Sequence, residues 1–270
     1  MKLFDLRKKL KLDFEKHQID TADVDFIIAE ILNVSRTELV LIDEVEDKTV
    51  EEIKTACEQR LNNVPVDSIF KKAYFYGLTF KVDENVLTPR SETELLVEKA
   101  IKLIKENNYH TVLDLCCGSG CLAISIKKNV PVEMTASDVS SKALKLAKQN
   151  AKDNQVEVNF KLSNMFEKID DKFDLIVSNP PYIDTEEINS LSEEVKNFDP
   201  RIALDGGALG LKFYNIIHNN LRKHLNESGR LIVEIGEDQK DMILSLFNDF
   251  TCEEIIQDYN GIDRFMVFKK

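Results

Sequence analysis

The chain has 270 residues, and 36 lysines and arginines stand against 48 aspartates and glutamates, which gives a net charge of −12. Hydrophobic residues make up 43% and charged residues 31% of the chain, a balance typical of folded globular proteins that excludes a disordered or fibrous chain. Proteins that bind nucleic-acid phosphates carry a basic surface, so the acidic balance disfavours bare DNA or RNA as the main partner.

The first residues form a helical stripe and not an export signal. Leu3, Leu6, Leu10 and Phe14 recur at helical spacing with charged residues between them. No apolar run approaches the roughly 20 residues that are needed to span a bilayer. We therefore expect a cytoplasmic protein without a membrane partner.

The five cysteines are an odd number in a chain without an export signal, so we expect reduced thiols. Cys116, Cys117 and Cys121 lie close together in the sequence. Their spacing matches no common zinc pattern, and adjacent cysteines do not easily bind one tetrahedral ion. No metal site is predicted.

Residues 1–75 are predicted to form a small helical domain, and residues 76–88 a β-hairpin linker. Ser35 with Glu38 and Thr49 with Glu52 have the spacing of capping boxes, which indicates two helix starts. In the linker, aromatic and β-branched residues alternate with polar ones, as expected for a hairpin between two domains.

The helical domain is strongly acidic between Asp20 and Glu52, where eleven acids stand against Arg36 and Lys48. Such a run usually only faces water. The alternative is a docking surface for a basic protein partner, which complementary charge would steer.

Residues 89–270 are predicted to form an α/β domain, because strands alternate with helical segments such as Ser140–Asn154 and Gly210–Leu225. This pattern indicates a parallel sheet with helices on both faces, followed by a final antiparallel hairpin. The expected strands are Thr111–Leu115, Glu133–Ser137, Glu157–Lys161, Phe173–Ser178, Arg230–Ile235, Thr251–Gln257 and Arg264–Lys269.

A small-residue turn follows the first strand of this domain and contains Gly118 and Gly120. Glycines there allow a ligand to approach the backbone, although such turns also close βα units for structural reasons alone. Asp138 ends the next strand, 138 − 114 = 24 residues after Asp114. An acid at this place reaches the ribose of a bound nucleoside. The alternative for Asp138 is a helix N-cap, a role that Ser140 could also fill.

The strand at 173–178 runs directly into Asn179, Pro180, Pro181 and Tyr182. Two prolines stop the strand and fix the backbone at the carboxyl edge of the sheet, where ligands of open α/β folds bind. The Asn179 side-chain oxygen and the Pro180 carbonyl are both acceptors, and together they can hold both hydrogens of a planar –NH2 group. A rigid turn is the alternative, but it explains neither the tyrosine nor the position.

These motifs carry a resemblance to a known family. DLCCGSG resembles the first motif of class I S-adenosylmethionine-dependent methyltransferases, and NPPY resembles the motif of those that methylate adenine N6, guanine N2 or glutamine N5. VLTPRSETE, FDPRIALDGGALGLKFY, GRLIVEIGEDQ and DYNGIDRF narrow the choice, and the chain is similar over essentially its whole length to the HemK/PrmC family. These enzymes methylate the glutamine N5 of the GGQ motif of peptide-chain release factors.

The resemblance implies a Rossmann-like methyltransferase domain of seven strands behind the helical domain and hairpin, with S-adenosylmethionine as cofactor and S-adenosylhomocysteine as product. It further implies a monomer in which residues 1–75 dock the release factor. The implied cofactor residues are Asp114, Cys116, Cys117, Gly118, Ser119, Gly120, Asp138, Asn164, Met165 and Asn179. The implied substrate-binding residues are Arg90, Asn179, Pro180, Pro181 and Tyr182, of which Asn179, Pro180 and Tyr182 are catalytic.

This sequence departs from the family at Cys116-Cys117, where Gly-Thr is usual, at Ser91, where proline is usual, and at Asp199, where glutamate is usual. Asn164 stands where an acid commonly accepts from the adenine amino group. Two other functions remain open: methylation of a ribosomal-protein glutamine or of adenine in nucleic acid, and non-catalytic nucleoside binding by an adaptor.

Overall fold

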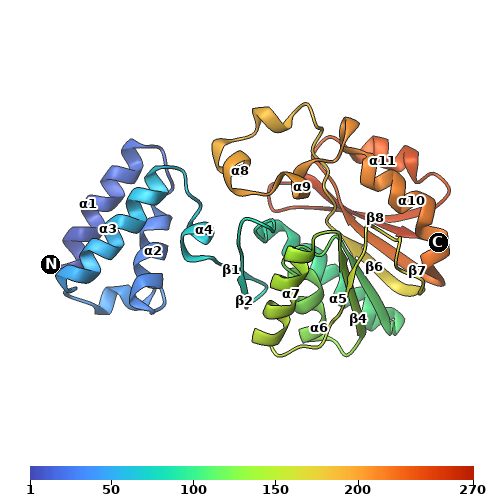
Figure 1. The fold of residues 1–270 in the computed structure, drawn as a ribbon, viewed down its shortest axis with the longest axis horizontal. Helices are drawn as coiled ribbons and strands as arrows, with labels where there is room; N and C mark the ends of the chain where they lie inside the picture. The colour runs from blue at the N-terminus through green and yellow to red at the C-terminus, as the bar shows by residue number, and fades with distance from the viewer. The chain divides into compact units, whose positions relative to one another are not determined.

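The computed structural model describes residues 1–270, which divide into two compact units, Met1–Lys71 and Lys72–Lys270 (Figure 1). The unit boundary therefore lies a few residues before the predicted linker, and the hairpin belongs to the second unit. None of the helices combines the length and the apolar character that crossing a membrane requires.

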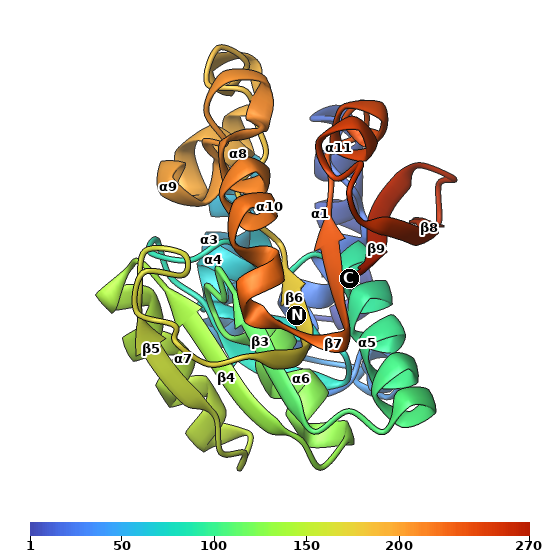
Figure 2. The same cartoon turned by 90° about the vertical axis from the view of Figure 1, so that its right-hand side faces the viewer.

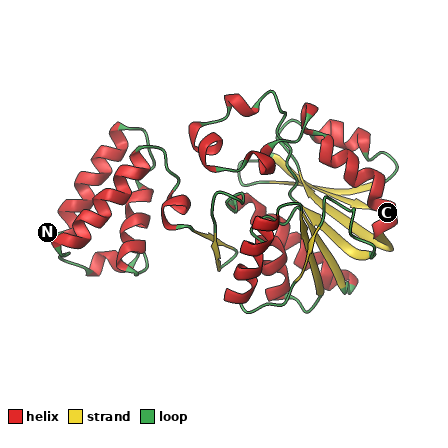
Figure 3. Ribbon diagram, in the orientation of Figure 1, coloured by secondary structure: helices red, strands yellow, loops and turns green.

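The first unit is all-helical (Figure 3). Leu3, Leu6, Leu10 and Phe14 are all buried in its core, so the predicted stripe is the inner face of the first helix. The elements of this unit are α1 (Leu3–Lys16), α2 (Ala22–Leu32), the 3₁₀ turn η1 (Glu38–Leu41), α3 (Asp47–Leu61) and α4 (Val66–Phe70).

Of the two predicted capping boxes, one forms. The Ser35 backbone N–H donates to the Glu38 carboxylate at 2.8 Å, and the Glu38 N–H donates to Ser35 Oγ at 3.3 Å. This box starts η1. The prediction for Thr49 was wrong, because α3 begins earlier, at Asp47, and Thr49 lies inside its first turn. A propensity pattern cannot fix a helix start to within one turn.

Part of the acidic run is neutralised within the first unit. Asp23 pairs with Arg60 at 2.7 Å, and Asp25 pairs with Arg7 at 2.9 Å and with Lys11 at 2.7 Å. The acids between η1 and the first turn of α3 are exposed, and they are Asp43, Glu44, Glu46 and Asp47.

The second unit contains a seven-stranded sheet in the order β5-β4-β3-β6-β7-β9-β8. The five strands from β5 to β7 are parallel, and β9 is antiparallel to both β7 and β8. The predicted fold class and terminal hairpin are therefore confirmed. The strands are β3 (Thr111–Leu115), β4 (Glu133–Asp138), β5 (Asn159–Leu162), β6 (Phe173–Ser178), β7 (Leu225–Glu234), β8 (Thr251–Gln257) and β9 (Asp263–Lys269).

Helices cover both faces of this sheet, as Figure 2 shows. Neighbouring strand residues point to opposite faces, so Val112 packs in the core under one helical layer and Leu113 in the core under the other. One layer comprises α5 (Glu94–Asn107), α6 (Cys121–Asn129) and α7 (Ser141–Asp153), and the other comprises α10 (Lys212–His224) and α11 (Lys240–Leu246).

Short elements surround the carboxyl edge of the sheet. Before α5 the chain forms the 3₁₀ turn η2 (Ser91–Thr93). After β6 it forms η3 (Ile188–Ser190), α8 (Glu193–Phe198), α9 (Arg201–Leu204) and η4 (Ala208–Gly210) before it enters α10.

The hairpin of β1 (Lys72–Phe75) and β2 (Leu78–Lys81) is fastened to the α/β core. Phe75 and Phe80 are buried in the core under α5 and α6. The Asn150 side chain of α7 accepts from the Lys81 N–H at 2.8 Å and donates to the Lys81 and Ser119 carbonyls at 3.0 and 2.9 Å. One buried amide thus joins the hairpin, α7 and the turn after β3.

Replacement of Asn150 by alanine should lower the free energy of unfolding by about 2–4 kcal/mol, because three hydrogen bonds are lost and buried backbone groups are left unpaired. Denaturant unfolding measures the change. Gln149→Ala, at an exposed position on the same helix, is the control and should change stability by about 0.5 kcal/mol or less. Equal stability of the two variants would contradict this role.

Candidate active site

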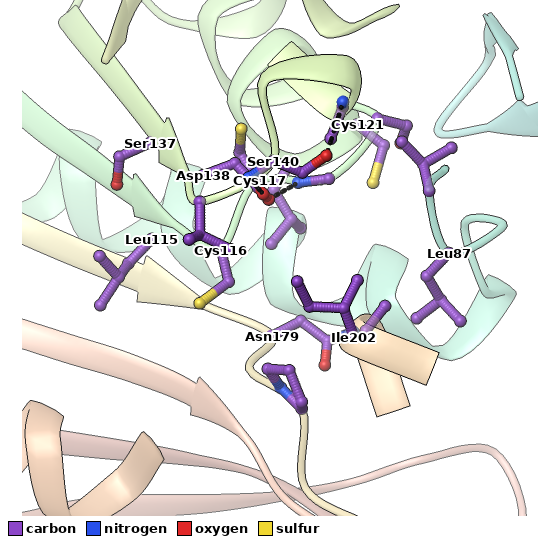
Figure 4. Close-up of a pocket in the computed structure, with 18 of the residues that line it drawn as sticks. Leu87, Leu115, Cys116, Cys117, Cys121, Ser137, Asp138, Ser140, Asn179 and Ile202 are labelled. Carbon is purple, nitrogen blue, oxygen red and sulfur yellow. Dashed lines mark hydrogen bonds between the residues drawn. The ribbon is translucent and has the colours of Figure 1, made fainter. Parts of the chain in front are cut away.

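A pocket opens at the carboxyl edge of the sheet, where the loops after β3, β4, β5 and β6 meet (Figure 4). Its empty volume is about 980 Å³, the open mouth included. The predicted site residues that line the pocket are Arg90, Cys116, Cys117, Gly118, Ser119, Asp138, Asn164, Met165, Asn179 and Pro181. Asp114, Gly120, Pro180 and Tyr182 lie outside its lining.

The turn after β3 has the backbone of a ligand cradle. Cys116, Gly118 and Gly120 have positive φ values of 65°, 51° and 81°. A Cβ atom on Gly120 would lie 3.1 Å from the Ala147 side chain, whereas a Cβ on Gly118 would meet nothing within 4 Å. Gly120 is therefore needed for close packing against α7, and the space over Gly118 is open to a ligand.

Asp114 lies beneath this turn and is fully buried. Its Oδ2 accepts from the Ala123 N–H at 3.0 Å, which fixes the first turn of α6, and its Oδ1 has no partner. Burial raises the pKa of the Asp114 carboxyl to about 7. Asp114 therefore supports the turn from below, and it does not line the pocket itself.

The cysteines of the turn behave as small apolar side chains. Burial raises the pKa of the Cys121 thiol to about 12 and raises that of Cys117 as well, so neither is a ready thiolate. Cys116 Sγ lies 3.6 Å from the sulfur of Met165. No group of three or more histidine, cysteine, aspartate or glutamate side chains is arranged to hold a metal ion.

Asp138 ends β4 and lines the pocket. Its two oxygens accept from the Gly118 N–H at 2.9 Å and the Ser140 N–H at 2.8 Å. Ser140 is the N-cap of α7, because its side chain accepts from the Ala143 N–H at 3.1 Å. Asp138 does not cap the helix, and a carboxylate with about four acceptor sites still has capacity for a ligand donor.

The pocket wall beside Asp138 also contains a hydroxyl group that has no hydrogen-bond partner in the protein. Ser137 is one of the lining residues, and its Oγ is buried without a hydrogen-bond partner. Buried polar atoms normally have partners, so an unpaired hydroxyl here suits a polar ligand. Together with the open space over Gly118, the residues present fit a nucleoside with an attached charged chain, as S-adenosylmethionine has.

The loop after β5 forms another wall. Met165 has a positive φ of 49° and is almost fully buried, and both Met165 and Asn164 line the pocket. The Asn164 amide nitrogen donates to Glu167 at 2.7 Å, which leaves its oxygen as the group available to a ligand donor.

Asn179 follows β6 and its side chain projects into the pocket beside Ile202 (Figure 4). No other protein group engages the polar atoms of this side chain. Pro181 lines the same wall. The Tyr182 hydroxyl turns away toward the core and donates to Glu234 at 3.4 Å.

Arg90 is placed at the pocket mouth by an ion pair. Its guanidinium donates to the carboxylate of Asp199, whose side chain is only 6% exposed, whereas that of Arg90 is 44% exposed. Both flanking segments reach the pocket, through Thr88 and Pro89 on one side and Ile202 on the other. The pair therefore ties together two edges of the entrance.

Sequence reasoning missed several lining residues, namely Leu87, Thr88, Thr93, Ser137, Ile202, Ala203 and Phe213. Most of them lie in VLTPRSETE and FDPRIALDGGALGLKFY, the segments that carried the family resemblance. The resemblance was the available signal, because these residue types are common and have no diagnostic spacing.

The sheet order gives a Rossmann-like domain, and sequence relatives together with a family model define the class: this chain is a methyltransferase. Residues 91–209 match the family model "Methyltransferase small domain", and residues 5–70 match "PrmC N-terminal domain". A methyltransferase of Pyrococcus furiosus shares the fold, with 16% identity, a TM-score of 0.53, and coverage of 72% of this chain and 89% of that one.

A 16S rRNA methyltransferase of T. thermophilus, solved in complex with AdoMet and guanosine, also shares the fold at 14% identity and a TM-score of 0.50, over 74% of this chain and 49% of that one. Sequence similarity is more specific. The release factor glutamine methyltransferase of Thermodesulfovibrio yellowstonii is 37% identical over 97% of both chains. The chain belongs to the family of release factor glutamine methyltransferases and is an enzyme.

Replacement of Asp138 by alanine should raise the Kd for S-adenosylhomocysteine roughly 30-fold, about 2 kcal/mol, because a charged acceptor is lost. Titration calorimetry measures this Kd. Lys142→Ala, at an exposed position in the first turn of α7 that does not line the pocket, is the control and should leave the Kd unchanged. An unchanged Kd in the Asp138 variant would remove this residue from the cofactor site.

Proposed function

We propose that this enzyme transfers a methyl group from S-adenosylmethionine to the side-chain N5 of the glutamine in the GGQ motif of peptide-chain release factors. The observation that carries the proposal is the Asn179 side chain, which projects into the pocket without a protein partner. The names of the relatives, which cover nearly the whole chain, support the release factor as substrate.

The amide nitrogen of glutamine is a poor nucleophile, because its lone pair is delocalised into the carbonyl group. The Asn179 oxygen and the Pro180 carbonyl would accept its two hydrogens and so orient the lone pair toward the cofactor side of the pocket. When bound, S-adenosylmethionine supplies an activated methyl group. Positioning of this kind can lower a barrier by roughly 7–11 kcal/mol. A methylated amide that carries an extra proton is very acidic and loses it to water.

In this proposal the cofactor lies across the turn after β3. Asp138 would accept from its ribose hydroxyls, and Asn164 would accept from the adenine amino group, against which Met165 would pack. The Gly118 backbone would lie under the methionine part. The unpaired Ser137 hydroxyl supports a polar ligand at this place.

Mass spectrometry of a co-expressed release factor tests the substrate. We expect the GGQ glutamine to gain the mass of one methylene group. Labelled cofactor with ribosomal protein or RNA tests the two alternatives, and labelling of either of these but not of the release factor would overturn the proposal. No labelling of any of these would leave the adaptor function, which has no need of an –NH2 site.

Asn179→Ala should reduce kcat by about 10²–10³-fold, as loss of a positioned group in other active sites does. The Kd for S-adenosylhomocysteine should stay within about twofold, because the lost acceptor orients the nucleophile. Asn215→Ala, at an exposed position of α10, is the control. Unchanged turnover by the Asn179 variant would contradict the mechanism.

We further propose that the acidic face of the first unit docks the release factor. Its exposed acids lie next to Val40 and Leu41, which are 74% and 79% exposed. Exposed apolar side chains rimmed by charge are typical of protein interfaces. Complementary charge would accelerate association with a basic partner.

Reversal of Asp43, Glu44, Glu46 and Asp47 to lysine should raise KM for whole release factor at low salt, and the difference should shrink as salt screens the charges. A short GGQ peptide should be methylated equally by both proteins. A variant with the same change in net charge, at the exposed acids Glu106, Glu133, Glu157 and Asp241, is the control. Equal KM for the whole factor would show that the acidic face only solvates the unit.

A further inference from the structure

A buried carboxylate joins the two segments that flank the acceptor side of the pocket. Glu234 ends β7, next to β6, and is 3% exposed. Its Oε1 accepts from the Tyr182 hydroxyl at 3.4 Å and its Oε2 accepts from the Thr93 hydroxyl at 2.9 Å. Thr93 lines the pocket, and Tyr182 closes the NPPY loop. Glu234 itself lies outside the lining.

Burial of the ionised Glu234 carboxylate costs free energy. Burial raises the pKa of Glu234 to about 7, and the Thr93 hydrogen bond and the charge of Arg264 offset this only in part. The Arg264 side chain is itself paired with Asp258 at 3.3 Å. A buried charge without a close cationic partner is a poor way to stabilise a fold, and perturbed carboxyls of this kind cluster at functional sites.

The backbone of Tyr182 is fixed as tightly as its side chain. The Gln239 amide nitrogen donates to the Tyr182 carbonyl at 2.8 Å and to the Leu209 carbonyl at 3.2 Å. A Cβ atom on Gly210 would lie 1.9 Å from the Tyr182 carbonyl oxygen, and one on Gly206 would lie 2.8 Å from its Cα. The Tyr182 backbone therefore fixes the NPPY loop, and Glu234 accepts a hydrogen bond from the hydroxyl at the end of the same side chain.

We propose that Glu234 is a positioning residue for methyl transfer, which accepts from Tyr182 and Thr93 together and thereby keeps the NPPY loop, with Asn179 and the Pro180 carbonyl, in place for the –NH2 group. The proposal rests on the proposed function, because the –NH2 group belongs to the glutamine. Only the ionised carboxylate accepts from both hydroxyls without a competing proton. The loop is therefore best ordered when Glu234 is ionised.

Glu234→Gln keeps the shape of the side chain and removes the charge. It should lower kcat by about 10–100-fold, because a small misplacement of reacting groups has effects of this size. KM for the cofactor and the Kd for S-adenosylhomocysteine should stay within about twofold, since Glu234 does not reach the cofactor side. Glu237→Gln, three residues on and exposed, is the matched control and should match the wild type.

The pH profile separates positioning from mere packing. In the wild type, kcat should rise as the pH increases through about 7 and Glu234 ionises. The other charged or titratable groups that face this carboxyl are Glu92, Cys121, Tyr182, Tyr214 and Arg264. Tyr214 donates to the Glu234 carbonyl. Cysteine, tyrosine and arginine titrate well above this range. Burial also raises the pKa of Asp114 to about 7, and Asp114 is present in both proteins, so the part of the rise that is lost in Glu234→Gln belongs to Glu234.

A double-mutant cycle tests whether Glu234 acts through Tyr182. Tyr182→Phe keeps the ring and removes the hydroxyl. If the two residues act together, the double variant should be no slower than the slower single variant. Losses that multiply would overturn the proposal, as would a Glu234→Gln protein with wild-type kcat and only a lower Tm.

Hydrogen exchange separates a failure of this proposal from a failure of the proposed function, because it needs no substrate. The Ile183 N–H donates to the Leu204 carbonyl at 3.0 Å and the Thr185 N–H to the Gly207 carbonyl at 3.2 Å. Exchange in residues 178–185 should be faster in Glu234→Gln than in Glu237→Gln. This comparison can be made even if the wild-type enzyme methylates no release factor. Equal exchange rates in the two variants would overturn the positioning role of Glu234, and faster exchange in Glu234→Gln would support it.

Discussion

The parallel pairing of β3 with β6 at the centre of the sheet positions every other part of the site. Leu115 and Ser178 are partners in this register, and the buried Ser178 hydroxyl donates to the Leu115 carbonyl at 2.7 Å. Each residue is the last of its strand, so the cradle for the cofactor and the NPPY loop start side by side. Since the chain leaves these two strands in opposite directions along the sheet, a crevice opens between their loops.

The two walls of this crevice use different chemistry. The wall made by the loops after β3 and β4 has spare acceptors at Asp138 and an unpaired hydroxyl at Ser137, which suit a ligand rich in donors. The wall after β6 presents the amide of Asn179 on a backbone that two prolines restrict. One pocket can therefore hold a nucleoside cofactor and a planar –NH2 group in adjacent places.

The residues behind the wall after β6 fix the NPPY loop in place and do not line the pocket. Gly206 and Gly210 let two turns approach Tyr182 more closely than any side chain would allow, and Gln239 bonds its carbonyl. Glu234 adds a buried carboxylate that packing alone does not require. A reaction that depends on orientation benefits from such support, because a poorly fixed acceptor loses most of the advantage of proximity.

The sequence by itself determined the parts that follow from local pattern. The stripe from Leu3 to Phe14, the strands Thr111–Leu115 and Phe173–Ser178, and the terminal hairpin were predictable, because periodicity and turn residues are properties of neighbouring positions. The start of α3 was not, because the helix begins at Asp47 without a side-chain cap, and the capping pattern at Thr49 lies inside its first turn.

The tertiary structure alone decided which residues meet across the chain. The link between Glu234 and Thr93 spans 141 residues, and that between Arg90 and Asp199 spans 109. It also excluded a helix-capping role for Asp138, since the Ser140 hydroxyl is the group that accepts from the Ala143 N–H. No local pattern encodes such pairs: they exist because strand order brings distant loops to one edge of the sheet.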